Sequence, residues 1–311
     1  MADFGSDDPF AGASQKLKEH YGIEVPVSAV RDVTEEHGER MRIHTPVQTE
    51  IPGKPGVPQL IAEVDGSMVP EVSTAPVQEG GQKGDRRKTR KVAWTEARLC
   101  LAHEKGSVTP VFGATLGSVD EAGEQLMNCA IRAGMGTKTK VHSVGDGAVW
   151  IAGQVDLQFG LQGRFLVDLY HLCEYLAPAA ASIAGEDKQA WMEKEKQKLK
   201  EHPTGEQEVI EDLKPFLEPE TVPDSAAPVR ACHRYMTNRP GQFDYYTVLK
   251  EELPVGSGEI ESAHRYVIQA RLKIAGAWWK IDNAAKMLAL RVCRANSSWD
   301  NYWNNTHPRA A

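Results

Sequence analysis

The spacing of hydrophobic residues predicts a short helical segment at the start of the chain. Apolar positions three to four residues apart predict helices over 13–22 and 29–38, with a turn containing glycine and proline between them. Helix, short turn and helix is the outline of a helix-turn-helix, and a plain helical hairpin has the same pattern. Residues 45–59 contain four prolines and are interpreted as a linker.

From Leu60 onward, short apolar runs replace the helical spacing and predict strands. Residues 60–72 predict a strand that ends in an Asp-Gly turn. Residues 91–102 and 107–117 predict two more strands, so that the three together form an antiparallel meander. An amphipathic helix is expected over 120–134.

The second half of the chain alternates between strand and helix patterns. A strand over 140–151 breaks at Gly-Asp-Gly, and a buried strand over 163–172 leads into a helix. Residues 189–218 are rich in Glu and Lys and are expected to be helical and mostly exposed. A helix over 260–275 follows a glycine loop, and a last helix covers 282–296. This order of elements predicts a mixed α/β fold.

One face of the helix over 260–275 is expected to pack on the sheet. The apolar residues that recur there near helical spacing are Ile260, Ala263, Val267, Ala270 and Ile274.

Length and composition limit the class of protein. A chain of 311 residues favours two folding units, and a hydrophobic content of 41% supports a sizeable buried core. The longest apolar runs are too short for a transmembrane helix, so no membrane partner is expected. Five widely spread cysteines without a Cys-x-x-Cys pair suit a reducing compartment. We therefore expect a cytoplasmic protein.

Charge is distributed unevenly, which changes the expected partner. The net charge of -7 taken alone disfavours nucleic acid. Residues 83–91, however, carry six basic side chains and one aspartate, and residues 264–311 carry eight Lys or Arg against two acids. Clustered basic charge is typical of polyanion-binding surfaces even in an acidic protein, although a solvated surface gives the same pattern.

Three carboxylates lie beside glycines near the ends of predicted elements. Asp65 and Asp146 each precede a glycine at a predicted strand end, and Glu261 lies in the first turn of the helix after Gly256-Ser257-Gly258. Each has an ordinary explanation, since Asp-Gly is a common turn and a glutamate favours a helix N-terminus. Together, on a meander followed by alternating helices and strands, they predict a ribonuclease-H-like sheet that gathers three acids. Carboxylate oxygens bind Mg²⁺, and paired ions serve phosphoryl transfer.

Several longer motifs occur in a characteristic order. They are Val64-Asp65-Gly66, GDGAVWI (145–151), VDLYHLCEYL (167–176), PVGSGEIESAHRYVIQARLKIAGAWW (254–279) and LALRVCRANSSWDNYW (288–303). With these motifs, residues 10–305 resemble bacterial insertion-sequence DDE transposases of the ISKra group, which are relatives of the mutator-type enzymes. The resemblance implies a catalytic triad of Asp65, Asp146 and Glu261. It also implies that these three hold two Mg²⁺ ions, for which Mn²⁺ can substitute.

The resemblance leaves two questions about the site. Glu259 competes with Glu261 for the third position, and Glu261 is preferred because the family pattern places the acid after Ser-Gly-x-Ile. Asp168 and His171 form a D-x-x-H pair that such transposases also contain. His171 either contacts DNA or orients a carboxylate; the alternative is a core histidine bonded to its own aspartate.

Basic and aromatic residues are the candidates for DNA contact. Arginines beside indoles suit phosphate binding and base stacking, although at least one of Trp278 and Trp279 is expected to be a core anchor. The DNA-contacting set is Arg86, Arg87, Lys88, Arg265, Arg271, Lys273 and Trp278.

The function implied is Mg²⁺-dependent cleavage at the ends of an insertion sequence, followed by strand transfer into target DNA. The expected partners are the element ends, the target DNA and a second copy or more of the chain, in a nucleoid-associated bacterial setting. One alternative is a ribonuclease-H-like nuclease without strand transfer. The other is a truncated or domesticated transposase that binds DNA without cutting.

The expected domains follow from these assignments. Residues 1–44 form the helix-turn-helix-like segment and 45–59 the linker. Residues 60–311 form the ribonuclease-H-like catalytic domain, in which a helical insertion covers about 172–255.

Overall fold

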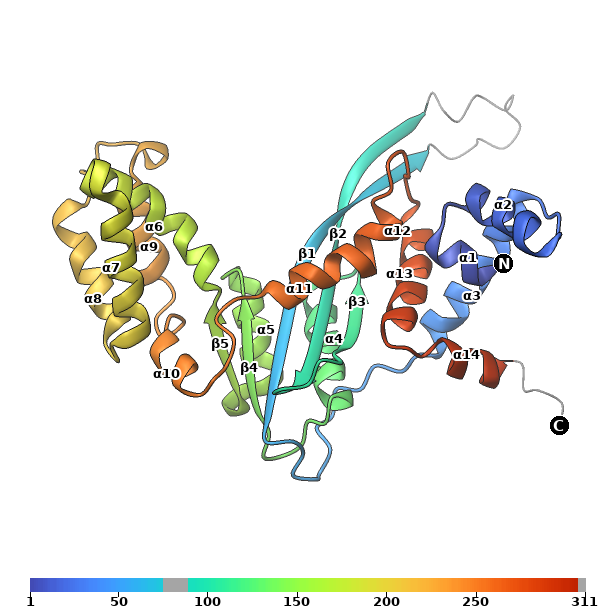
Figure 1. Ribbon diagram of the computed structural model, residues 1–311, viewed down its shortest axis with the longest axis horizontal. Helices are drawn as coiled ribbons and strands as arrows, with labels where there is room; N and C mark the ends of the chain where they lie inside the picture. Colours follow the sequence, from blue (N-terminus) through green and yellow to red (C-terminus); the bar gives the residue numbers. More distant parts are fainter. Residues whose placement is uncertain (75–88, 307–311) are drawn as a thin grey trace. The chain divides into compact units, whose positions relative to one another are not determined.

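A computed structural model of the protein describes residues 1–74 and 89–306 (Figure 1). The chain divides into two compact units. The first unit comprises Met1–Val57, Val64–Thr137 and Glu259–Ala311, and the second comprises Pro58–Glu63 and Lys138–Gly258. Each unit is therefore built from segments that are far apart in the sequence. Among the described residues, no helix combines the length and the apolar character needed to span a bilayer.

The strands form a five-stranded sheet in the order β3-β2-β1-β4-β5. Their bounds are β1 Gln59–Thr74, β2 Arg90–Glu104, β3 Val111–Thr115, β4 Lys140–Gly145 and β5 Gly163–Val167. Strand β2 pairs antiparallel with β3, whereas β4 pairs parallel with both β1 and β5. The sheet is therefore mixed, and the α/β class predicted from the sequence is confirmed.

Strand β1 is longer than the sequence pattern suggested. The prediction that it ends in a turn at Asp65-Gly66 is wrong, because β1 continues through both residues to Thr74. A Cβ atom added to Gly66 would clash with the side chain of Glu96 on β2. The glycine thus provides room for a neighbouring strand's side chain rather than a turn.

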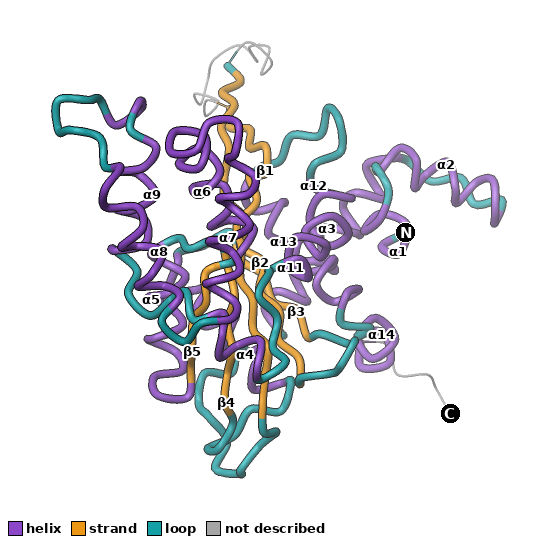
Figure 2. The backbone as a smooth tube through the Cα atoms, turned by 60° about the vertical axis from the view of Figure 1, so that its left-hand side comes forward, coloured by secondary structure: helices purple, strands orange, loops and turns teal. Residues whose placement is uncertain are grey.

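The first unit surrounds its part of the sheet with helices from both ends of the chain. Their bounds are α1 Ala2–Asp7, α2 Phe10–Tyr21, α3 Val27–His44, α4 Val119–Arg132, α11 Gly258–Ala263, a π-helix His264–Gln269, α12 Ala270–Leu272, α13 Ile281–Ala295 and α14 Trp299–Thr306. Helix α4 packs against β2 and β3 (Figure 2). Alternate residues of a strand point to opposite faces of the sheet. On one face of β2, Ala97, Leu99 and Leu101 belong to a buried cluster that also contains Ile260, Val267 and Leu288.

The N-terminal helices belong to this unit rather than forming a separate one. Helix α3 packs along α13, and Asn283 of α13 donates a 2.8 Å hydrogen bond to Glu35 of α3. Arg291 and Arg294 of α13 pair with Asp7 and Asp3 of the first helix. Residues 1–44, which were expected to form a separate segment, therefore belong to the first unit.

The second unit contains β4, β5 and most of the remaining helices. Its elements are α5 Val149–Phe159, α6 Leu169–Ala184, α7 Lys188–Glu201, α8 Gly205–Leu213, α9 Pro228–Thr237, α10 Tyr245–Lys250 and short 3₁₀ turns at Gly160–Gln162, Gly185–Asp187, Lys214–Phe216 and Asp224–Ala226. Helix α6 packs against α7 and α9, and α8 packs against both α7 and α9. The Glu- and Lys-rich stretch 189–218 is mostly helical, as predicted, with a break at 202–204 between α7 and α8.

A π-helix shifts the buried face of the segment after α11. Ile260, Ala263 and Val267 are buried as predicted, but the expected burial of Ala270 is wrong, and Ile274 is only partly buried. The widened turn over His264–Gln269 shifts the helical phase, so Ile268 and Leu272 enter the core instead.

Candidate functional site

Asp65 lies in β1 beside a buried histidine. The Nε2 atom of His264, the first residue of the π-helix, is 3.3 Å from Asp65 Oδ2. The other carboxylate oxygen, Oδ1, accepts a 2.7 Å hydrogen bond from the backbone N–H of Gly66. His264 is 3% exposed, while about a third of the Asp65 side chain reaches solvent. The imidazole therefore lies close to one oxygen of a carboxylate that stays accessible, although the two form no hydrogen bond.

The two candidate glutamates of α11 differ in their surroundings. Glu259 Oε2 lies 2.8 Å from Nε2 of His103, a buried residue of β2. Glu261 is exposed, and its carboxylate has no hydrogen bond or ion pair within the described ranges. One oxygen of Glu259 thus faces a histidine of the sheet, whereas neither oxygen of Glu261 has a partner in the described part of the chain. This difference favours Glu261 as the third acid.

Asp146 follows β4 and closes a turn in the second unit. Its Oδ1 accepts a 2.8 Å hydrogen bond from the N–H of Ala148, at the start of α5. Oδ2 has no partner among the residues that the structure describes. Gly147 has a φ of 78°, which glycine adopts without strain, and a Cβ there would clash with the hydroxyl of Tyr235. The prediction that β4 breaks at Gly145-Asp146-Gly147 is confirmed.

Two residues in and just after α9 hold this turn by its backbone. The hydroxyl of Tyr235 donates to the carbonyl of Asp146 at 3.1 Å, and Nε of Arg239 donates to the carbonyl of Gly147 at 2.9 Å. The Arg239 guanidinium lies 3.9 Å from the Tyr235 ring centroid, and Tyr175 stacks on Tyr235 at 3.8 Å. Burial raises the pKa of Tyr235, so the hydroxyl keeps its proton and remains a donor.

Asp168 is buried and serves as a structural cap. Its Oδ1 accepts from the N–H groups of Tyr170 and His171, in the first turn of α6. Its Oδ2 accepts from both the N–H and the hydroxyl of Ser257 at 2.6 Å. Asp168 thus ties the start of α6 to the glycine loop that precedes α11.

His171 does not pair with Asp168 through its ring. The imidazole Nδ1 is 3.4 Å from Glu174, and only the backbone N–H of His171 bonds Asp168. The ring lies 6.2 Å from Tyr175 and 6.4 Å from Tyr235, both measured between centroids. The interpretation of a histidine bonded by its ring to its own aspartate is therefore wrong.

The predicted DNA-contacting residues fall into three groups: residues outside the described part of the chain, exposed residues, which include Trp278, and one buried residue, Arg271. Arg86, Arg87 and Lys88 lie outside the described residues. Arg265 is exposed, and Lys273 is exposed and donates to the hydroxyl of Ser67 at 3.2 Å.

Arg271 is 3% exposed, which removes it from any DNA surface. Its Nε donates to the carbonyl of Gly5, and its guanidinium lies against the rings of Phe10 and Trp279. Burial, with Arg291 nearby, lowers the pKa of Arg271 to about 10. The expectation that this residue contacts DNA is corrected: it anchors the N-terminal helices.

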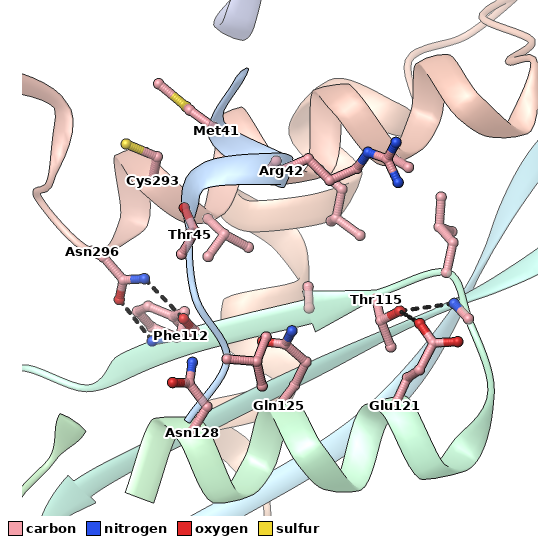
Figure 3. A pocket seen from close by; sticks show the side chains of 18 of the residues that line it. Met41, Arg42, Thr45, Phe112, Thr115, Glu121, Gln125, Asn128, Cys293 and Asn296 are labelled. Carbon is pink, nitrogen blue, oxygen red and sulfur yellow. Dashed lines mark hydrogen bonds between the residues drawn. The ribbon is translucent and has the colours of Figure 1, made fainter. Parts of the chain in front are cut away.

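A cavity lies elsewhere in the first unit (Figure 3). It has a volume of about 370 Å³ and lies between the end of α3, β3, α4 and α13. Asn296 bonds the backbone of Phe112 at its rim through both side-chain atoms, at 2.7 and 2.8 Å. None of the predicted catalytic or DNA-contacting residues lines this cavity.

The structure assigns the predicted acids to different units. Asp65 and Glu261 belong to the first unit and Asp146 to the second. Within residues 1–74 and 89–306, no three His, Cys, Asp or Glu side chains form a ready metal-binding group. Searches against models of protein families and against curated proteins return no match.

The sequence analysis missed four residues that contact the candidate acids or their turn. They are His103, His264, Tyr235 and Arg239. His264 lies three residues after Glu261, so an i, i+3 pair on the predicted helix was an available signal. Tyr235 and Arg239 left no signal, because their partners are backbone carbonyls nearly ninety positions earlier.

Proposed function

We propose that the protein is a DDE-type transposase that cleaves DNA and transfers the freed strand, using a ribonuclease-H-like catalytic fold. The observation that carries the proposal is that Asp65 lies in β1 and that Asp146 directly follows β4, the strand that pairs parallel with β1. Ala62 of β1 pairs with Ser143 of β4. Asp65 and Asp146 each come three residues later in the chain. Both acids thus come soon after the paired residues of two parallel strands in a mixed α/β sheet.

The donor chemistry of the three carboxylates fits Mg²⁺. Hard carboxylate oxygens are the ligands that this ion prefers, and it keeps several waters when bound by few carboxylates. Asp146 Oδ2 and both oxygens of Glu261 are unengaged in the described part of the chain, and Asp65 is partly exposed. We propose that Asp65 and Asp146 hold the metals and that Glu261 completes the second site.

The chain's own residues would keep these carboxylates in productive positions. Bound Mg²⁺ would supply activation of the attacking oxygen and stabilisation of the leaving one. His264 lies beside Asp65, and Tyr235 and Arg239 fix the turn that carries Asp146. Asp168 fixes the loop before α11 through Ser257. No covalent intermediate is required: water would attack phosphorus and displace the 3′-oxygen of the element end, and the freed 3′-hydroxyl would then attack a target phosphorus and displace the 3′-oxygen of the target strand.

Replacing Asp146 by asparagine tests the proposal. Asp146→Asn keeps the shape and one hydrogen-bonding oxygen but removes the charge that holds a divalent ion. Cleavage and joining should both disappear, while DNA binding persists, because phosphate contacts come mainly from Arg and Lys. The assay uses Mg²⁺ or Mn²⁺ with end-labelled DNA that flanks the gene, and it scores nicked and joined strands.

His171→Ala provides the contrast within the same unit. Its imidazole contacts Glu174 and aromatic rings rather than a candidate ligand. Cleavage should fall without disappearing, and metal binding should remain. Full activity of Asp146→Asn would overturn the transposase mechanism. A complete loss in folded, metal-binding His171→Ala would make this histidine essential to the chemistry.

A further inference from the structure

The first residues of β2 are exposed on both faces of the strand. Arg90–Trp94 are all exposed, and burial begins only farther along β2. Arg90, Val92 and Trp94 alternate along the strand and therefore share one face. Trp94 is 57% exposed and Val92 is 55% exposed, which is unusual for residues with so much apolar surface.

Trp278 extends this face from a different part of the chain. The ring centroid of Trp278 lies 6.1 Å from that of Trp94. The Arg90 guanidinium lies over the Trp278 ring, 4.8 Å from its centroid. Trp278 therefore has an aromatic neighbour and a cationic neighbour while remaining 37% exposed. We call Arg90, Val92, Trp94 and Trp278 the indole face.

The next residue fixes Trp278 to the sheet. Trp279 is buried, and its Nε1 donates to the carbonyl of Leu272 at 3.0 Å. Its backbone pairs with β1: Val72 N–H donates to the Trp279 carbonyl at 2.7 Å, and Trp279 N–H donates to Pro70 at 3.1 Å. Successive residues of an extended segment point to opposite sides, so burying Trp279 directs Trp278 outward. The exposed indole is thus held in place before any partner arrives.

We propose that the indole face binds unpaired bases of single-stranded DNA by stacking. Every base has a flat π-face that stacks on an indole, whereas paired bases in a duplex already cover these faces with one another. Arg90 adds a cation that suits the adjoining phosphates, and Lys280, two residues after Trp278, is exposed as well. The inference rests on the proposed function, since base pairs beside the strand ends that cleavage creates open more readily than pairs inside a duplex.

The size of the indole face argues against a second copy of the chain as its occupant. A fully buried aromatic side chain covers about 150–250 Å², and both indoles here are already partly covered. A stable protein interface buries about 800 Å² on each partner, which exceeds what two half-covered indoles and one valine supply. A few stacked bases match the available area better.

Binding measured without metal separates this inference from catalysis. The probes are a fluorescent oligothymidine of about 20 nucleotides and a duplex of equal length, each titrated with the full chain and followed by anisotropy. Trp94→Ala and Trp278→Ala should each weaken single-strand binding about 5- to 150-fold, because stacking on one aromatic has that magnitude. Duplex binding should change less than about twofold, since phosphate contacts dominate it.

Conservative and distant variants provide the controls. Trp94→Phe and Trp278→Phe keep a stacking ring and should recover most of the single-strand affinity. Phe216→Ala removes an exposed aromatic from the second unit and should leave both affinities unchanged. An equal loss for duplex and single strand, or no loss for either, would overturn the inference.

Two further outcomes are informative. If light scattering shows that the alanine variants abolish a dimer while single-strand affinity persists, the indole face is a contact between copies and the inference fails. If the wild-type chain binds single strands through these tryptophans but never cleaves DNA, the inference stands and the proposed function fails.

Discussion

At the scale of single residues, the two buried histidines beside α11 have separate partners. His264 contacts Asp65, which we propose as a metal ligand, whereas His103 contacts Glu259, which we do not. Groups that orient a metal-binding side chain without touching the metal commonly change metal affinity when removed. The two histidines therefore form a matched pair for testing which glutamate and which strand belong to the site.

His264→Ala should weaken Mn²⁺ binding by the DNA-free protein about 10- to 100-fold, because Asp65 loses the imidazole that lies 3.3 Å from its Oδ2. Isothermal titration calorimetry measures the affinity, and circular dichroism checks the fold. His264→Gln retains a hydrogen-bonding side chain and should recover part of the affinity. His103→Ala should leave metal affinity unchanged. Equal losses in both alanine variants would mean that either histidine acts only through general stability.

His142 makes stability depend on pH. Its Nε2 donates to the carbonyl of Pro254 at 2.8 Å, and the residue is 1% exposed. Burial lowers the pKa of His142 to about 4. Since the folded pKa lies below the unfolded value, the unfolded chain binds the proton more readily, and acid favours unfolding.

The free energy of unfolding should therefore fall as pH drops from about 6.5 to about 4, by up to about 3 kcal/mol from this residue. Urea denaturation at a series of pH values measures the loss. His142→Gln removes the titrating group and should flatten the curve in this window. An unchanged slope in His142→Gln would assign the acid sensitivity to other groups.

At the scale of elements, Gly38 sets how closely α3 approaches α13. The sequence predicted that the helix ends at Gly38, and this prediction is wrong, because α3 continues to His44. A Cβ atom on Gly38 would lie 2.5 Å from the carbonyl oxygen of Lys286 on α13. The glycine is therefore required for packing between helices from opposite ends of the chain.

Gly38→Ala should destabilise the protein by about 1–3 kcal/mol, since the overpacked contact outweighs the gain in helix propensity. Gly12→Ala, in α2, is the control, because its nearest neighbours lie 4.0 Å from an added Cβ. That variant should be neutral or more stable by up to about 1 kcal/mol. Thermal unfolding followed by circular dichroism compares the two. A Gly38→Ala protein as stable as Gly12→Ala would contradict the packing role.

At the scale of the whole molecule, DNA binding should depend steeply on salt although the net charge is -7. Binding to phosphates releases counterions, so affinity falls with salt in proportion to the number of contacts. Replacing Arg86, Arg87 and Lys88 by alanine should reduce the slope of log affinity against log salt by about 2 to 3. These residues lie outside the described ranges, and the prediction rests on their sequence.

A charge-matched variant controls for net charge alone. Lys188, Lys194 and Lys200 lie on α7 in the second unit, and their triple alanine variant removes the same charge. Its salt slope should stay at the wild-type value. Equal slopes for both triple variants would show that the basic run 83–91 makes no specific phosphate contacts.

The sequence by itself determined the elements and much of their order. Short apolar runs predicted β2 and β3, and helical spacing predicted α4. These features are local, because the pattern of a strand or helix is set by which of its own faces is covered. The Gly-Asp-Gly break after β4 is local for the same reason, since only glycine adopts the backbone of Gly147 easily.

Only the tertiary structure decided which partners the candidate acids have and which basic residues are accessible. Arg271 follows the same basic pattern as Lys273, yet it is buried against Phe10, more than 260 positions away. The contact between His264 and Asp65 joins a helix to a strand far earlier in the chain, and spacing along the sequence does not show such a partner. Hydrogen bonds such as the one from Tyr235 to the Asp146 carbonyl involve backbone atoms, which every residue possesses. Such contacts depend on chain path rather than residue type, and a sequence pattern therefore does not encode them locally.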